Sequence, residues 1–274
     1  MSTTGRPGTR TVAWTARRLR KRRALAASGR ESTWWAPAAA GWWTGVLFAG
    51  GSACFAVGAA PGYVDAVGVA ADGVTFFVGS LLFTVAAALQ YLEVVDAGPG
   101  SQASQATPAR GLRRVLSWEP RHIGWLAVVA QLAGTVFFNL STFDAMRDHL
   151  SATRANRLVW TPDALGSICF LVASGLAWGE AGPGWRSWRP RDPSWRITAL
   201  NLAGSIAFGV SAVASHIVPA ADQPRNVTLM NLGTFAGALC FLAGGVLLLP
   251  ERTHDAPTLS TPTPEESPWS CTPS

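Results

Sequence analysis

The feature that most limits how this chain can fold is a five-residue pattern that recurs in every long apolar segment. The pattern is Gly, a small residue, two unrestricted positions and then Phe, as in GSLLF at residues 79–83. The segment around this copy, residues 73–95, begins with 17 uncharged residues, about the minimum for a helix that crosses a ~30 Å hydrocarbon core. Six copies in six such segments predict an all-α polytopic membrane protein with six transmembrane helices.

The six predicted spans pair into three repeated hairpins that run in the same sense. The spans cover residues 42–60, 73–95, 123–146, 160–181, 196–219 and 227–250, and the hairpins cover about 42–95, 123–181 and 196–250. Hairpins in the same orientation would be related by an axis along the membrane normal. The chain then divides into a basic N-terminal tail (1–40), a transmembrane domain (41–251) and a disordered C-terminal tail (252–274).

The basic residues predict the orientation of these spans. Charged residues make up 14% of the chain, against roughly 25% in ordinary globular proteins, and 18 of the 22 Lys and Arg lie in the tails and in the second and fourth loops. Cytoplasmic segments carry such an excess, so we expect both termini in the cytoplasm and a location in the plasma (inner) membrane. The wealth of Arg, Ala and Gly indicates a bacterial source.

The densest basic run, RRLRKRR at residues 17–23, leaves two interpretations open. It can form a surface helix that binds anionic lipid headgroups, worth about 1 kcal/mol per basic residue. We favour a solvated cytoplasmic anchor that fixes the orientation. Because topology accounts for the positive charge, we predict the lipid bilayer as the partner and no nucleic acid, and the sequence specifies no protein partner or oligomeric state.

The recurring pattern favours close helix packing over chemistry. Its Gly and Phe are four residues apart and share one helix face, so the Gly admits a neighbouring backbone and the Phe fills the groove beside the neighbour's Gly. The adjacent Ser or Thr can bond across helices or back onto its own turn. The predicted helix-packing residues are Gly51, Phe55, Gly79, Phe83, Gly134, Phe138, Gly166, Phe170, Gly204, Phe208, Gly233, Gly237 and Phe241.

A second signal comes from polar residues inside the spans, most of which follow one helix face. The candidate polar or ligand-facing residues are Gln131, Thr135, Asn139, Asp144, Asp163, Asn201, His216 and Asn231. They can bond helices to one another, cap helix ends (as Asp163 would after Pro162), or bind a cation or relay a proton. We favour bonds and caps over a ligand site.

The sequence carries no enzyme signature. It has no HExxH, GxSxG, Walker or GxGxxG motif, and its four His residues are scattered over two loops, one span and a tail. We therefore predict no catalytic residue, no metal site and no cofactor, and a protein that is not an enzyme.

The stretch FFVGSLLFT at residues 76–84, followed by an Ala run and Gln90, resembles the helical-hairpin module called YrhK-like. With residues 130–142 and 159–174, it resembles uncharacterised bacterial multi-pass proteins. No activity is established for that family, so the resemblance implies a fold alone. The leading functional prediction is a non-enzymatic structural or partner-binding membrane protein. The alternative is a small-solute or ion transporter or channel that uses the polar stripes of spans three to five.

Overall fold

The computed structural model describes residues 34–35, 37, 40–96, 118–181 and 188–250. Five of its helices are long and apolar enough to cross a membrane: α4 (Val69–Asp96), α6 (Ile123–Ala145), α8 (Thr161–Ala181) with the turns before it, α9 (Pro193–Ser215) and α10 (Val227–Leu248). The chain is thus an all-α, multi-pass integral membrane protein whose helices contact lipid. The two predicted tails lie almost wholly outside the described residues.

The first predicted span forms α2 (Ala40–Gly58), which is not one of these five helices. Its run Gly41–Gly45 consists of Gly, Trp and Thr and contains no aliphatic side chain. The helix nevertheless packs along α4 and α10 in the same bundle. A sixth span therefore stays a prediction.

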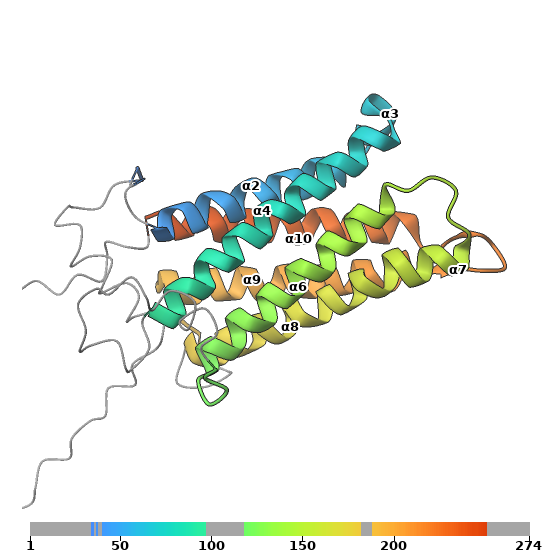
Figure 1. The fold of residues 1–274 in the computed structure, drawn as a ribbon. Helices are drawn as coiled ribbons and strands as arrows, with labels where there is room; N and C mark the ends of the chain where they lie inside the picture. The colour runs from blue at the N-terminus through green and yellow to red at the C-terminus, as the bar shows by residue number, and fades with distance from the viewer. Residues whose placement is uncertain (1–33, 36, 38–39, 97–117, 182–187, 251–274) are drawn as a thin grey trace, which may run out of the picture.

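The helices form a closed ring in which each packs on the two beside it (Figure 1). In chain order the contacts join α2 to α4, then α6, α8, α9 and α10, and α10 closes the ring on α2. Helix direction alternates, so α2 begins and α10 ends at the same end of the bundle, which we call the tail end. The opposite end, the loop end, carries the short helices α3 (Tyr63–Val67) and α7 (Ala152–Ala155).

The helix of the fourth predicted span begins earlier than residue 160, the start that the sequence pattern predicts. The helix continues from α7 through a π-helical turn, η3 (Asn156–Trp160), into α8, and the whole helical stretch starts at Ala152. Pro162 has no N–H group and disturbs regular α-helical bonding, which the wider π turn accommodates. Asp163 therefore lies inside a helix, and the prediction that it caps a helix start is wrong.

A pair of short antiparallel strands follows α9, whose helix ends at Ser215 rather than at residue 219. The strands β1 (Ile217–Val218) and β2 (Gln223–Pro224) are tied to the π turn by Asn156. The Asn156 Nδ2 donates to the Ile217 carbonyl at 2.7 Å, and its Oδ1 accepts from the Ile217 N–H at 2.9 Å. These two hydrogen bonds thus join the π turn and the strand pair into one unit at the loop end, which we call the cover.

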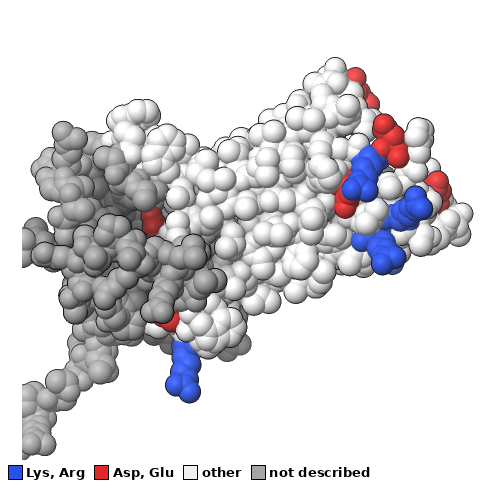
Figure 2. Space-filling view, viewed as in Figure 1, with Lys and Arg blue, Asp and Glu red and all other residues white. Residues whose placement is uncertain are grey.

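The side of the bundle carries a broad band without charge. In Figure 2, Lys, Arg, Asp and Glu lie at the loop end and beside the residues drawn in grey, and the face between them is uncharged. Aliphatic side chains on the helices are about half exposed, among them Val85, Val136, Ile168 and Ile206. Such a surface suits lipid acyl chains, which offer no partner to a charge.

A second repeated pattern, Trp-x-Pro followed seven residues after its first Trp by another Trp, spans the starts of α2, α6 and α9, with the second Trp inside the helix. The two Trp rings of each copy meet edge-on, at 5.1 Å for Trp35–Trp42, 5.2 Å for Trp118–Trp125 and 4.9 Å for Trp188–Trp195. The second Trp is buried in each copy and lies nine residues before the motif Gly. Reasoning from apolar segments missed this pattern because it lies at their edges.

Candidate functional site

Within each hairpin, the two motif glycines face each other. A Cβ added to Gly51 would lie 2.8 Å from the Gly79 carbonyl oxygen, and one added to Gly79 would lie 3.0 Å from that of Gly51. In the other two pairs, a Cβ on Gly166 would lie 3.1 Å from the Gly134 carbonyl oxygen, and Cβ atoms on Gly204 and Gly237 would lie 3.1 Å and 3.0 Å from each other's carbonyl oxygens. Larger residues would force the backbones apart, so close approach of the two helices requires Gly at these positions.

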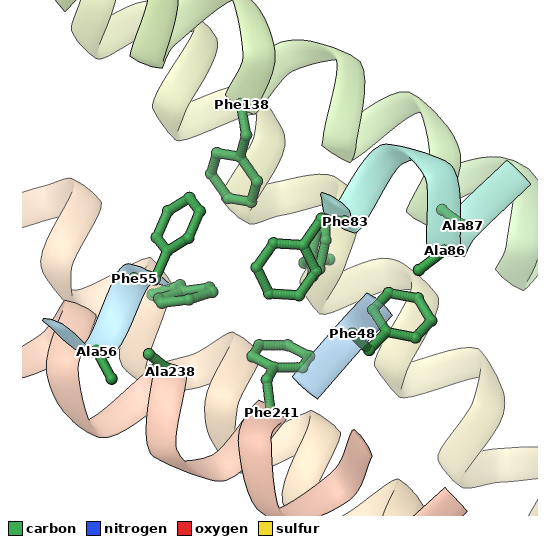
Figure 3. Close-up of a cluster of buried hydrophobic side chains, with 11 residues drawn as sticks. Phe48, Phe55, Ala56, Phe83, Ala86, Ala87, Phe138, Ala238 and Phe241 are labelled. Carbon is green, nitrogen blue, oxygen red and sulfur yellow. The ribbon is translucent and has the colours of Figure 1, made fainter. Parts of the chain in front are cut away.

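The six motif phenylalanines meet on the axis of the bundle as two stacked triangles, which we call the phenylalanine core. Figure 3 shows Phe55, Phe83, Phe138 and Phe241 pointing toward one another. The loop-side triangle consists of Phe55, Phe138 and Phe208, with centroids 6.0–6.4 Å apart. The tail-side triangle consists of Phe83, Phe170 and Phe241, with centroids 5.6–6.3 Å apart. Each hairpin thus contributes one ring to each triangle.

The small residue after each motif Gly is fully or almost fully buried, and its hydroxyl, where it has one, is bonded. Ser52 and Thr135 donate to carbonyls of their own helices, those of Phe48 and Leu132. Ser205 Oγ lies 2.7 Å from Ser174 Oγ of α8, besides 2.9 Å from the Asn201 carbonyl of its own helix. These hydroxyls therefore form hydrogen bonds within their own helical turn, to a neighbouring helix, or to both.

The candidate polar residues do not come together at one place. Asn139 donates to Thr84 Oγ1 at 2.8 Å, which joins α6 to α4. Asp144 pairs with Arg147 at 2.8 Å near the loop end. The ring of His216 lies 4.7 Å from that of Trp160. These three side chains therefore contact three different neighbours and do not form a single ligand site.

The remaining candidates lie on other parts of the helices. Asn231 is exposed, and Thr135 is buried beside the phenylalanine core. Gln131 and Asn201 are half-buried and lie three residues before the motif Gly of α6 and α9. Because these helices run from the tail end to the loop end, both residues lie on the tail side of the core. Phe48 occupies the same position in α2 and packs on Phe83 at 5.8 Å.

One small cavity lies directly against the loop-side triangle. Its volume is about 30 Å³, and its lining consists of Phe55, Phe138, Asp163, Ser167, Phe208, Ser211 and Thr234. Asp163 and Thr234 each lie three residues before a motif Gly, on helices that run toward the tail end. All four residues thus lie three positions before a motif Gly. Asp163 and Thr234 lie on the loop side of the phenylalanine core, and Gln131 and Asn201 lie on its tail side.

Ser211 is the cavity residue that reasoning from polar stripes missed. It lies seven residues, about two helical turns, after the motif Gly of α9, so it shares the face of that Gly. Its Oγ donates to the Met230 carbonyl at 2.8 Å and lies 2.8 Å from Thr234 Oγ1. The helical spacing from Gly204 could have indicated it. Among the described residues, no three His, Cys, Asp or Glu side chains are grouped to hold a metal ion.

Comparison with known proteins identifies no relative of this chain. No family model matches the sequence, and neither a curated protein nor a solved structure is significantly similar to it. The YrhK-like resemblance therefore stays a prediction.

Proposed function

We propose that this protein is a non-enzymatic structural or partner-binding component of a bacterial plasma membrane. Its six helices cross the membrane as three repeated hairpins, with both termini in the cytoplasm and the YrhK-like module as the repeating unit. The basic tail, residues 1–40, offers a surface for anionic lipid or for a protein partner.

The repeat is supported by two patterns that keep one spacing. The second Trp of the edge-on pair precedes the motif Gly by nine residues in all three hairpins. Equivalent Gly–Gly approaches and equivalent Phe–Phe contacts then follow in each hairpin. A single five-residue pattern can recur by composition, whereas linked patterns with equivalent contacts favour a common unit.

The phenylalanine core is the observation that carries the proposal of a closed bundle. Its rings lie in contact, with centroids no more than 6.4 Å apart within each triangle. Rings at this separation leave no room for a hydrated ion or solute between them. The core separates the cavity beside Asp163 from the polar residues Gln131 and Asn201, so the two polar levels are not joined by water.

A small-solute or ion carrier is the second candidate, because polar residues lie on both sides of this core. Asp163 and Thr234 lie toward the loop end, and Gln131 and Asn201 lie toward the tail end. The π turn before Pro162 adds an irregular stretch of helix, a feature that is frequent at functional sites. In a carrier, the phenylalanine rings would act as the gate between the two levels.

Reconstituted liposomes test the proposal. We expect wild-type protein to give the same sodium, potassium and small-sugar fluxes as protein-free liposomes. The double variant Phe138→Ala/Phe170→Ala removes two adjacent rings and is expected to leak, which shows that the assay detects an opened core. Saturable flux through the wild-type protein would overturn the proposal in favour of a carrier.

A further inference from the structure

The cavity beside the loop-side triangle breaks the threefold pattern of the core. Three residues before the motif Gly, α4 carries Phe76, α8 carries Asp163 and α10 carries Thr234. Phe76 packs on Phe55 with centroids 5.4 Å apart and covers Gly58. The shorter polar side chains of the other two helices leave the cavity of about 30 Å³. That volume exceeds the about 10–15 Å³ that a single water molecule needs, so the cavity has room for a small ion.

The hydroxyl groups that line the cavity direct their protons at neighbouring oxygens. Ser211 Oγ donates its one proton to the Met230 carbonyl. Thr234 Oγ1 must therefore donate the hydrogen bond that joins it to Ser211 Oγ. Ser167 Oγ is turned toward the Phe208 carbonyl at 3.5 Å. With these protons directed at neighbours, the oxygen lone pairs remain for a guest in the cavity.

Among the described residues, no basic side chain pairs with the carboxyl group of Asp163. Within the described ranges, its one side-chain partner is Ser215. The loop-side triangle closes the cavity toward the tail end with three apolar rings. A carboxyl group at membrane depth, facing the bundle interior, stays ionised where a positive charge compensates it and otherwise takes up a proton.

From this geometry we infer that the cavity binds one small monovalent cation of the sodium class. One carboxylate neutralises one positive charge, and an all-oxygen donor set suits hard cations rather than soft metals. Divalent calcium sites use six to eight oxygen ligands, more than a cavity of this volume and four polar side chains supply. The cation enters from the loop end, because the phenylalanine core blocks the other side. The inference goes beyond the proposed function, since a closed bundle and a carrier would both hold the ion.

Thermal unfolding of the purified full-length protein tests this site. We would measure the Tm in sodium, potassium and choline chloride at one ionic strength, over a range of concentrations. Sodium is expected to raise the Tm in a saturable way relative to choline, by about 5–10 °C at 100 times the Kd. Asp163→Asn keeps the shape of the side chain and is expected to abolish the shift. Asp148→Asn, an exposed change at the loop end, is the matched control and is expected to retain it.

A second pair of variants and a direct assay cover the case in which Asp163→Asn does not fold. Ser211→Ala and Thr234→Val remove one oxygen donor each and are expected to weaken sodium binding about tenfold. Equilibrium binding of radioactive sodium to the wild-type protein is expected to reach one ion per chain. Equal Tm values in sodium and choline, a shift retained by Asp163→Asn, or the absence of saturable sodium binding would each overturn the inference.

Discussion

The rings of Phe208 and Phe241 are stacked, with centroids 5.3 Å apart and planes inclined by 24°. The two residues come from neighbouring helices of one hairpin and belong to different triangles, so this contact joins the two triangles. Matching pairs in the other hairpins, Phe55–Phe83 and Phe138–Phe170, have centroids 5.5 Å and 5.2 Å apart. The core is therefore a single cluster to which every long helix contributes one ring.

Removing one ring from this cluster should cost more stability than removing an exposed ring. Phe83 is 1% exposed, and Phe83→Ala is expected to lower the free energy of unfolding by about 3–5 kcal/mol through a cavity that neighbours cannot fill. Phe143→Ala removes a ring that is 49% exposed, so it serves as the control, with a loss below about 1 kcal/mol. Urea or thermal unfolding in detergent measures both. Equal losses would contradict a packed core.

A methyl group at a motif glycine should separate the helices of its hairpin. A Cβ on Gly237 would lie 2.6 Å from Phe208 Cδ1, so Gly237→Ala is expected to destabilise the protein by about 1–3 kcal/mol. At Gly50 the nearest atom would lie 3.6 Å away, an ordinary contact, and Gly50→Ala is the matched control. The Tm values of the two variants would be compared. If Gly50→Ala lowered the Tm as much as Gly237→Ala, the loss would reflect a general intolerance of Ala in these helices and not the close approach at Gly237.

Two buried serines at the same motif position should differ in their contribution to stability. Both hydroxyls bond a carbonyl of their own helix, Ser205 that of Asn201 and Ser52 that of Phe48, but Ser205 also bonds Ser174 on the neighbouring helix. Ser205→Ala is expected to lower the free energy of unfolding by about 0.6–1.7 kcal/mol, from the average to the maximum for interhelical hydrogen bonds in a membrane protein, and Ser52→Ala by less. Both variants would be compared by unfolding in one detergent, and a larger loss for Ser52→Ala would refute the assignment.

The cover at the loop end should loosen when Asn156 is shortened. Asn156→Ala removes both hydrogen bonds to Ile217, so faster hydrogen exchange is expected over residues 217–224 with little change in the core helices. Asn231→Ala, an exposed amide on α10, is the control. Unchanged exchange at the strand pair would show that Asn156 does not hold it.

The sequence predicted the helices and their approximate ends, because apolar runs of membrane length leave few alternatives. It placed the start of the fourth span wrongly, since Pro162 and the polar residues before it resembled a helix start. The structure instead continues the helix through a π turn, which depends on the tertiary contacts of Asn156 and Trp160. Local pattern carries no information on such contacts.

The sequence predicted less of the candidate site than of the fold. The helical spacing identified Asp163 as a polar residue inside a span, and the structure places it in the cavity. Its companions Ser167, Ser211 and Thr234 come from three helices, and one sequence gives no measure of how those helices rotate against one another. Asn139 and Asp144, candidates from the same list, instead bond Thr84 and Arg147.

The most direct test of the closed bundle is labelling of single cysteines by a membrane-impermeant maleimide applied to the loop-end side. The background lacks the native cysteines, and the new ones replace Gln131, Asn201 and, as an exposed control, Asp148. The closed phenylalanine core predicts rapid labelling of the control and protection of positions 131 and 201. Labelling of those two positions as fast as the control would reveal a water-filled path through the core and contradict the account.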